Sequence, residues 1–363
     1  MSFDTEVIAP QEAQNKQAGP FLAYPEAFKE EAEYRHNIVF KDLCRYGIKP
    51  LDDAMRAIAP KELIVIAAAP GSGKTECALA ISRYNALRGK RVVHYHLEGG
   101  RQDAVARMLW RDITDLYFRE YKDEGIELDY RRWVLNENPH PLFLKMASMV
   151  YGELKEKLQD KLFFYESKHG LTYDKFCESL NHFAEGVVYD PEDDKMKPHK
   201  LNIDLIVVDH IHYFRFPDEQ EEIRAMTKIM MTCQEIVEQH NIPIVVVAHL
   251  RKLPRQHGIP DQMDIYGTSN IPKIANTCLI LVPDHERDNP TEGLYPTFIR
   301  VAKSRQGLRQ NVLINTTFDI KTRKYLDHYD LYRCGNNGDV SSEALPIQDC
   351  PAWYRQAYNE RTL

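Results

Sequence analysis

The residues with the clearest chemical signature form the glycine-containing run Ala68-Ala69-Pro70-Gly71-Ser72-Gly73-Lys74-Thr75. Its glycines let successive backbone N–H groups point inward around phosphate oxygens, and the helix expected to follow adds its dipole. The lysine of such a loop reaches the β- and γ-phosphates, and the threonine hydroxyl binds Mg²⁺. The run therefore predicts a site for ATP and Mg²⁺ formed by Pro70, Gly71, Ser72, Gly73, Lys74, Thr75 and Glu76.

Three further polar residues follow apolar runs that are typical of buried strands. Asp209 is expected at the carboxyl edge of the sheet, where it would hold Mg²⁺ through water, although a turn aspartate would look the same. Glu98 could orient and deprotonate the attacking water, and an ordinary surface glutamate is an equal alternative. His249 could sense the γ-phosphate, or it is an ordinary histidine at a sheet edge.

Two groups of cations are candidates for phosphate contacts. The basic, proline-containing loop after His249 offers Arg251, Lys252 and Arg255 to a nucleic-acid backbone, but its composition alone favours a solvated loop. Lys303 and Arg305 leave a later strand on one face. They could reach the γ-phosphate of a neighbouring subunit as an arginine finger, or simply lie at a sheet edge.

Two histidine pairs raise the question of a metal site. His94 and His96, like His210 and His212, are separated by one residue, so each pair places two imidazoles on one face of a strand. No third or fourth ligand is evident nearby in the sequence. A metal site is therefore not predicted at either pair.

Apolar runs and helical spacing alternate along the chain, which predicts βαβ units and a mainly parallel sheet flanked by helices, an α/β fold. The expected strands are 63–68, 91–97, 162–165, 205–208, 242–248, 277–282, 298–302, 311–318 and 324–325. The expected helices are 25–34, 75–87 and 219–240, within a mostly helical stretch 99–200 whose end, 187–200, is expected to be a loop. The pattern predicts an N-terminal arm over 1–42, an ATPase domain over 43–332 and a tail over 333–363.

The composition is that of a globular protein, with 43% hydrophobic and 28% charged residues among 363. No apolar run approaches the roughly 18 residues that span a bilayer, and the first residues lack the apolar core of a secretory signal. A cytoplasmic protein without a membrane partner is expected. The net charge of −7 disfavours indiscriminate coating of nucleic acid but allows a local basic loop or channel. The seven cysteines form no Cys-x-x-Cys pair, which disfavours zinc and redox motifs.

From about Gly47 to Tyr325, the chain resembles the RecA-like replicative ring helicases, namely DnaB and the Twinkle and phage helicase-primase group. His96-Leu97-Glu98 matches the family's Ser-Leu-Glu element, and Val208-Asp209-His210-Ile211-His212 stands where DnaB has Asp-Tyr-Leu-Gln. Val247-Ala248-His249-Leu250 is closer to the Twinkle and phage form, which has His in place of Gln.

Two later segments extend the resemblance. Met263-Asp264-Ile265-Tyr266-Gly267-Thr268-Ser269 is similar to the family's DNA-loop element, with Tyr266 in place of Arg. Lys303-Ser304-Arg305-Gln306-Gly307 looks like the family's Lys-x-Arg-x-Gly trans-acting finger. No collar domain of the DnaB kind is expected in the first forty or so residues.

The resemblance implies a RecA-like P-loop NTPase fold with C-terminal antiparallel strands and a DNA helicase or translocase that moves on single-stranded DNA. It further implies a homo-oligomeric ring, expected to be a hexamer, with Glu98 as catalytic base and Arg305 acting in trans. Two alternatives stay open. One is a regulatory or assembly ATPase of the same superfamily that does not unwind DNA. The other is a small-molecule or nucleotide kinase, for which an arginine-rich lid would be expected.

Overall fold

The computed structural model describes residues 24–137, 140–165, 171–185, 187–189, 198–200, 202–214, 219–252, 258–285, 291–305, 312–335 and 337–362. These residues belong to two compact units, divided between Leu43 and Cys44. In the first unit, the helix α1 (Tyr24–His36) has no buried residue and is followed by the short 3-10 turn Phe40–Asp42. No helix in the described part of the chain is both long and apolar enough to span a bilayer.

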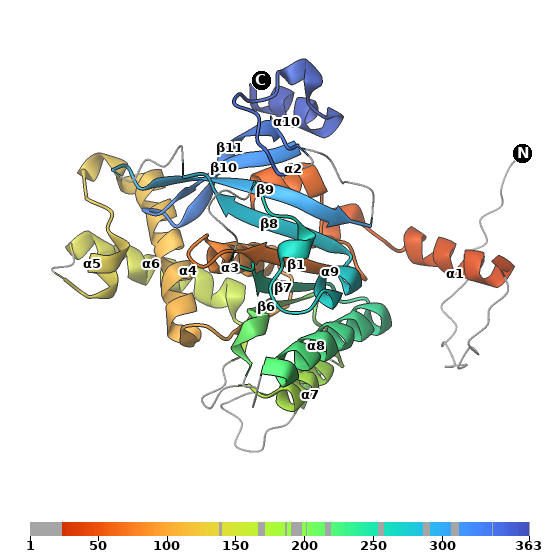
Figure 1. Ribbon diagram of the computed structural model, residues 1–363. Helices are drawn as coiled ribbons and strands as arrows, with labels where there is room; N and C mark the ends of the chain where they lie inside the picture. Colours follow the sequence, from red (N-terminus) through yellow and green to blue (C-terminus); the bar gives the residue numbers. More distant parts are fainter. Residues whose placement is uncertain are drawn as a thin grey trace, which may run out of the picture. The chain divides into compact units, whose positions relative to one another are not determined.

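The second unit is built on a mixed sheet (Figure 1). Its strands are β1 (Leu63–Ala68), β2 (Val92–His96), β3 (Leu162–Tyr165), β6 (Leu205–Asp209), β7 (Ile244–His249), β8 (Thr277–Pro283), β9 (Leu294–Ser304), β10 (Val312–Asp319) and β11 (Lys324–Arg333). The spatial order is β11-β10-β9-β8-β1-β7-β6-β2-β3. The six strands from β8 to β3 run parallel, whereas β9, β10 and β11 add an antiparallel extension.

Helices cover both faces of the sheet because its central strands are apolar on both faces. Ile64, Ile66 and Ala68 of β1 pack on one face with α2 (Lys49–Met55), α3 (Lys74–Leu87) and α10 (Ala352–Thr362). The alternate residues of β1 pack on the other face with α7 (Tyr173–Ala184), α8 (Glu219–His240) and α9 (Asn270–Ile274). Figure 1 shows α7 and α8 side by side on that face. With helices on the two faces, the carboxyl ends of the parallel strands form one edge of the sheet, and the loop between β1 and α3 lies at that edge.

A helical layer beside α3 has a core of its own. It contains α4 (Gly100–Leu116), α5 (Tyr130–Val134) and α6 (Pro141–Leu158), and a π-helical turn, Tyr117–Tyr121, extends α4. Trp110 is fully buried among the aromatic and aliphatic side chains of this layer. Its indole Nε1 donates to the Lys321 carbonyl at 2.6 Å, which joins α4 to the turn between β10 and β11. Short 3-10 turns lie at Lys122–Glu124, Ile211–Tyr213, Gln262–Asp264 and Ile347–Asp349.

The α/β fold expected from the sequence is confirmed, including the parallel centre and the antiparallel C-terminal strands. The expectation of a plain loop over 187–200 is wrong at its ends, where β4 (Val187–Tyr189) and β5 (Pro198–Lys200) pair antiparallel. The charged residues that suggested a loop lie between these strands, outside the described residues. Residues of the expected tail pack on the ATPase unit, where Tyr354 donates to the Tyr329 carbonyl at 3.3 Å. The division at residue 332 stays a prediction.

Candidate nucleotide-binding and catalytic site

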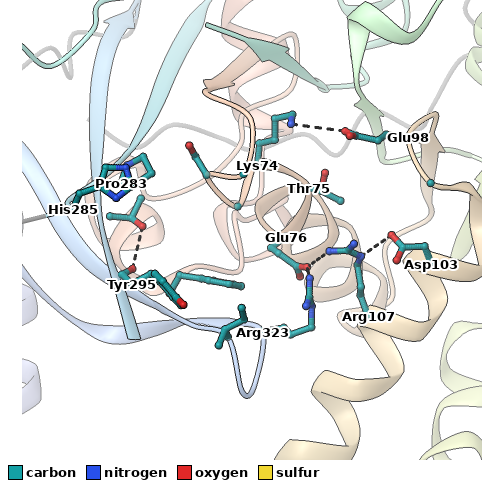
Figure 2. A pocket seen from close by; sticks show the side chains of 17 residues that line it. Lys74, Thr75, Glu76, Glu98, Asp103, Arg107, Pro283, His285, Tyr295 and Arg323 are labelled. Atoms are coloured by element: carbon teal, nitrogen blue, oxygen red, sulfur yellow. Dashed lines mark hydrogen bonds and ion pairs between the residues drawn. The ribbon is translucent and has the colours of Figure 1, made fainter. Parts of the chain in front are cut away.

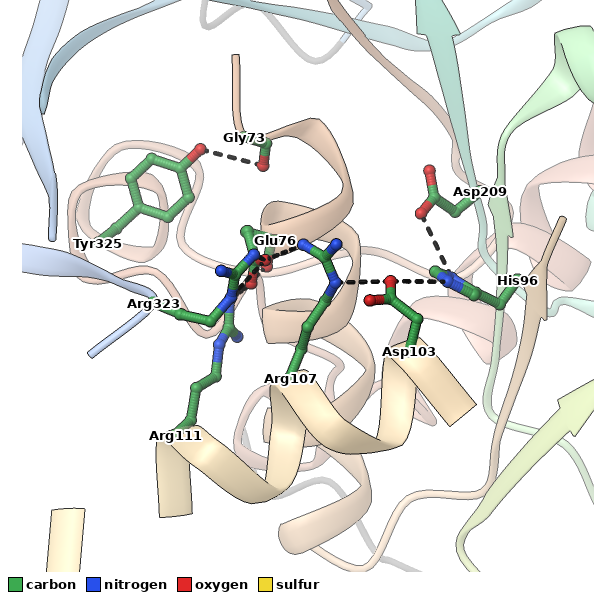
Figure 3. Close-up of polar contacts among 9 residues, drawn as sticks. All are labelled: Gly73, Glu76, His96, Asp103, Arg107, Arg111, Asp209, Arg323 and Tyr325. Atoms are coloured by element: carbon green, nitrogen blue, oxygen red, sulfur yellow. Dashed lines mark hydrogen bonds and ion pairs between the residues drawn. The ribbon is translucent and has the colours of Figure 1, made fainter. Parts of the chain in front are cut away.

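The phosphate loop joins β1 to α3, as the sequence predicts, and α3 begins at Lys74. Gly71 and Gly73 have φ values of 80° and 78°, which a residue with a side chain adopts only under strain. A Cβ added to Gly73 would lie 2.7 Å from Tyr325 Oη, whose hydroxyl donates to the Gly73 carbonyl at 3.3 Å (Figure 3). The loop is therefore held against β11 by a contact that only glycine permits.

A pocket of about 700 Å³ opens beside this loop (Figure 2). Its volume suits a nucleotide, because small-molecule sites commonly enclose about 300–1,000 Å³. One wall is polar and is formed by residues 71–76 with Glu98, Gly99, Asp103 and Arg107. The opposite wall comes from the end of β8, from β9 and β10, and from the turn before β11, and it includes Pro283, His285, Tyr295, Thr297, Phe318, Ile320 and Arg323. Of the predicted nucleotide-binding residues, Pro70 and Lys303 do not line this pocket in the described part of the chain.

Strand register brings the predicted catalytic residues together at the carboxyl edge of the sheet. His96 is the register partner of Asp209, and Ala68 is the partner of His249. The Lys74 ammonium lies 3.8 Å from Glu98 Oε2 across the pocket. Asp209 is fully buried, and this burial raises the pKa of its carboxyl to about 7.

His210 and His212, which follow Asp209 in the chain, lie close to Glu98 and His249. His210 Nε2 lies 3.2 Å from Glu98 Oε2, and its ring meets that of His249 edge-on with centroids 4.3 Å apart. His212 Nδ1 accepts from the His249 backbone N–H at 3.4 Å, and His212 Nε2 is 3.3 Å from the Tyr266 carbonyl oxygen. Burial, followed by the neighbouring His249, lowers the pKa of His210 to about 2 and that of His212 to about 4. Both imidazoles are therefore neutral near pH 7.

Glu76, directly after the phosphate loop, is the centre of an arginine cluster (Figure 3). Its carboxylate accepts from Arg107 at 2.6 Å, from Arg111 at 2.8 Å and from Arg323 Nε at 2.9 Å. Burial acts to raise the pKa of Glu76, but the three guanidiniums outweigh it and hold that pKa below its usual range. Arg107 also binds Asp103 at 2.6 Å, and the Arg323 guanidinium lies 4.4 Å from the Tyr130 ring centroid. The cluster ties α3 to α4 and to the turn before β11.

The predicted finger residues lie elsewhere, against the end of α9. Lys303 Nζ donates to the carbonyls of Pro272 at 2.5 Å and Ala275 at 2.7 Å. Arg305 donates to the Lys273 carbonyl at 3.0 Å. Neither side chain lines the pocket of its own chain.

The predicted nucleic-acid residues Arg251 and Lys252 are exposed just beyond β7, whereas Arg255 lies outside the described residues. The backbone here pairs with the segment that resembles a DNA loop. Arg251 N donates to the Asp264 carbonyl and Tyr266 N donates to the His249 carbonyl, both at 2.8 Å. The His249 segment and the Tyr266 segment are therefore joined side by side by backbone hydrogen bonds.

The residues present fit a bound Mg²⁺–nucleotide. In the described part of the chain, Ser72 Oγ and both carboxylate oxygens of Asp209 are buried without a hydrogen-bond partner. Buried polar atoms are normally paired, so these atoms are arranged for a ligand that supplies the partner. Thr75 lines the pocket beside them. Phosphate oxygens and a hard divalent cation match this set of donors and acceptors.

Sequence reasoning missed the arginine cluster and the contact between His210 and Glu98. Arg323 and Glu76 are 247 residues apart, so no local pattern joins them. His210 was considered only as half of a histidine pair, although its position directly after Asp209 was a usable signal. The apolar wall of the pocket was also missed, because its residues are spread over β8, β9, β10 and the turn before β11.

Comparisons with known proteins agree with this geometry. Residues 44–130 match the family described as "DnaB-like helicase C terminal domain". The chain is 24% identical over 328 residues to the replicative DNA helicase DnaB of Mycoplasma pneumoniae, covering 84% of this chain and 62% of that protein. It is 22% identical over 299 residues to DnaB of Haemophilus influenzae, covering 78% of this chain and 57% of that protein. The chain spans 52–62% of the length of the curated relatives reported for it.

Two solved structures share the fold. A DnaB-like replicative helicase, solved to show its interactions with primase, superposes with a TM-score of 0.64 at 14% identity, covering 84% of this chain and 68% of that one. An ATPase domain superposes with a TM-score of 0.63 at 15% identity, covering 84% of this chain and 99% of that one. Together with the phosphate loop and the carboxyl-edge residues, these matches show that the chain is similar to RecA-like replicative helicases of the DnaB type.

Proposed function

We propose that this protein is an ATP-dependent DNA helicase or translocase of the DnaB/Twinkle type, which hydrolyses ATP at subunit interfaces and moves on single-stranded DNA. The observation that carries the proposal is the position of Glu98, whose carboxylate lies 3.8 Å from the Lys74 ammonium across the pocket beside the phosphate loop. A lysine for the phosphates and a carboxylate for water thus lie next to each other in the wall of one pocket.

The pocket is divided in a way that suits ATP (Figure 2). The backbone N–H groups from Gly71 to Thr75 and the N-terminus of α3 bind the phosphates. The wall that contains Tyr295 and Phe318 offers aromatic and apolar surface to the base. Thr75 and Asp209 would hold Mg²⁺, which would supply positive charge to neutralise the phosphate oxygens.

Glu98 acts on the water that attacks the γ-phosphorus. Its carboxylate orients the water and accepts one of its protons, while the γ-phosphoryl group leaves the β-phosphate oxygen. The Lys74 ammonium stabilises the charge on the phosphate oxygens. The geometry supports this assignment because Glu98 follows β2 and faces the amino end of α3.

Hydrolysis at a subunit interface is supported by the place of the finger residues. Lys303 and Arg305 do not line the pocket of their own chain, and both lie on the end of β9 and the residue after it. A cation so placed is available to the nucleotide of a neighbouring subunit. We therefore propose a homo-oligomeric ring, a hexamer, acting in the cytoplasm.

Coupling to DNA would pass through His249. Its backbone bonds both His212 and the Tyr266 segment, and its ring contacts His210, which contacts Glu98. A change at the γ-phosphate therefore has a short contiguous route to the Tyr266 segment and to the exposed residues Arg251 and Lys252. These residues would face single-stranded DNA, with Arg255, which lies outside the described residues, in the same loop.

The test is ATP hydrolysis with and without single-stranded DNA, combined with strand separation on a forked duplex, at two protein concentrations. The helicase proposal expects DNA to stimulate hydrolysis, a specific rate that rises with protein concentration, and ATP-dependent unwinding. Arg251→Ala with Lys252→Ala should weaken DNA stimulation without changing ATP binding, and Lys145→Ala, an exposed cation on α6, is the charge control. ATP hydrolysis that ignores DNA, with no unwinding, would instead identify a regulatory or assembly ATPase.

A further inference from the structure

Three metal-ligating side chains meet inside the sheet edge, below the nucleotide pocket. His94 and His96 point to the same face of β2, and Asp209 ends the neighbouring strand β6. Each offers one ligand atom, and these atoms all lie within 4.8 Å of one another. His94 and Asp209 are fully buried and His96 is 3% exposed. Figure 3 shows the direct approach of His96 to Asp209.

The cluster holds an unusual concentration of unsatisfied polar atoms. Among the described residues, His94 Nε2, both ring nitrogens of His96 and both carboxylate oxygens of Asp209 have no hydrogen-bond partner. A buried polar atom that is left unpaired destabilises the folded chain. Mg²⁺ at the phosphates would satisfy oxygen atoms of Asp209, but it does not bind the imidazole nitrogens, because it prefers oxygen ligands. The nitrogens therefore require a partner of different chemistry.

The surroundings of the two histidines orient them as ligands. His94 Nδ1 lies 2.7 Å from Ser82 Oγ, so the hydroxyl can accept the Nδ1 proton and leave the Nε2 lone pair facing the cluster. His96 Nε2 lies 3.7 Å from Asp103 Oδ2, while its Nδ1 faces Asp209 Oδ2 at 3.6 Å. Metal-bound histidines almost always direct their other ring nitrogen to an oxygen atom in this way.

From this arrangement we propose that His94, His96 and Asp209 bind a divalent first-row transition-metal ion such as Zn²⁺. Two imidazole nitrogens and one carboxylate oxygen are ligands that select such ions over Mg²⁺. In a tetrahedral site with bonds of about 2.0–2.1 Å, neighbouring ligand atoms lie about 3.4 Å apart. The 3.6 Å between His96 Nδ1 and Asp209 Oδ2 is close to this spacing, and all separations among the three ligand atoms of the cluster lie within 4.8 Å.

The ion would share Asp209 with the nucleotide site. A carboxylate has two oxygens with lone pairs on both sides, so one oxygen can face His96 while the other faces the phosphate loop. Asp103, which lies beside His96, is 32% exposed and lines the nucleotide pocket, which gives the ion a path from solvent. A fourth ligand position would be taken by water, as in sites with three protein ligands.

The test measures metal content and not ATPase activity. A negative result would therefore contradict the metal site without contradicting the helicase proposal. The full chain, freed of metal, is titrated with Zn²⁺ without nucleotide or Mg²⁺, desalted, and analysed by mass spectrometry for bound zinc. We expect about one ion per wild-type chain, and an affinity at least about tenfold lower for His94→Gln and for His96→Ser. His328→Ala, at an exposed histidine, and His249→Ala, at the neighbouring imidazole cluster, should keep the ion.

A second measurement covers the case in which the histidine variants fail to fold. Pulsed electron paramagnetic resonance on the wild-type chain loaded with one equivalent of Cu²⁺ counts the coordinated imidazoles, and two are expected. Wild-type protein that retains no zinc, zinc binding that survives both histidine substitutions, or loss of zinc in His249→Ala would overturn the proposal. A Cu²⁺ spectrum without two imidazoles would also overturn it.

Discussion

His210 Nε2 lies 3.2 Å from Glu98 Oε2, and the other nitrogen of the same ring, Nδ1, accepts from the His212 backbone N–H at 3.3 Å. Because Nδ1 accepts, the ring proton of the neutral imidazole is on Nε2, the nitrogen nearest to Glu98 Oε2, although the two atoms do not have hydrogen-bond geometry toward each other. Glu98 thus has a neighbouring N–H group, from the segment after Asp209, that could orient its carboxylate when the nucleotide is bound. His210 is a positioning residue, since it contacts the base and not the phosphates.

Replacing His210 tests this orientation. We expect His210→Phe to lower kcat for ATP hydrolysis by about tenfold or more, because Glu98 loses its donor, while KM for ATP changes by less than about threefold. His210→Gln places an amide N–H near the position of Nε2 and should restore much of the rate. Steady-state kinetics with ATP over pH 6–9 provide the measurement. Equal losses in the Phe and Gln variants would show that His210 serves packing alone.

Glu76 binds Arg107, Arg111 and Arg323 and so connects α3, next to the phosphate loop, to α4 and to the turn before β11. Its substitution by Gln leaves buried guanidiniums without their carboxylate, and removal of one partner of a buried ion pair typically costs about 3–5 kcal/mol. We expect the free energy of unfolding in urea to fall by about 3 kcal/mol for Glu76→Gln in the absence of nucleotide. Glu153→Gln, which removes an exposed carboxylate paired with Lys157, is the control and should change the unfolding free energy by less than about 1 kcal/mol. Similar losses in the two variants would contradict a central role for the cluster.

Much of the fold and the centre of the site could be predicted because their signals are local. The strand before the phosphate loop, the loop itself and Lys74 are contiguous in sequence, and their roles follow from residue type and spacing. Asp209 was recognisable because an apolar strand ends at it. These features need no knowledge of which strands are neighbours.

The remainder depends on sheet order, which the local pattern does not contain. Asp209 completes the triad with His94 and His96 only because β6 pairs with β2, more than a hundred residues earlier in the chain. Likewise, Arg323 reaches Glu76 only because the turn between β10 and β11 folds over α3. Local spacing therefore shows the histidines and the charged residues but could not reveal Asp209 as a third candidate ligand beside His94 and His96.

Asp52 gives the protein a pH dependence outside the nucleotide site. Its carboxylate accepts from the backbone N–H groups of Tyr46 at 2.7 Å and Gly47 at 3.0 Å, yet burial raises its pKa from 3.8 to about 6. Between these values the folded chain binds more protons than the unfolded chain, so the unfolding free energy falls as pH rises. The shift of about two units corresponds to about 3 kcal/mol at most.

Asp52→Asn removes this titration. Comparing the two proteins therefore shows whether Asp52 makes the unfolding free energy fall or rise with pH. Denaturant titrations of both proteins at pH 4, 5, 6 and 7 should show wild type losing about 2–3 kcal/mol relative to the Asn variant as the pH rises. The Asn variant differs from wild type by a further, constant amount because its amide replaces one acceptor, and that offset does not affect the slope. A difference that is constant over the whole range would contradict the raised pKa.

Arg305 is held on its own subunit by the Lys273 carbonyl, so action on a neighbour requires that contact to be exchanged for a phosphate. We expect Arg305→Ala to lower ATP hydrolysis by about 10³-fold or more while ATP binding is kept, as for a finger acting in trans. Lys74→Ala should be inactive because its phosphate loop is damaged. Lys145→Ala, an exposed cation on α6, should keep the wild-type rate.

Mixing the two inactive proteins tests whether the finger acts across the interface. In a ring assembled at random from equal amounts, roughly a quarter of the interfaces join an intact phosphate loop from the Arg305→Ala subunit to an intact finger from the Lys74→Ala subunit. ATPase activity should therefore reappear on mixing, measured after subunit exchange at a concentration where rings form. If Arg305 acts within its own chain, no interface regains both parts, and the mixture stays as inactive as its components.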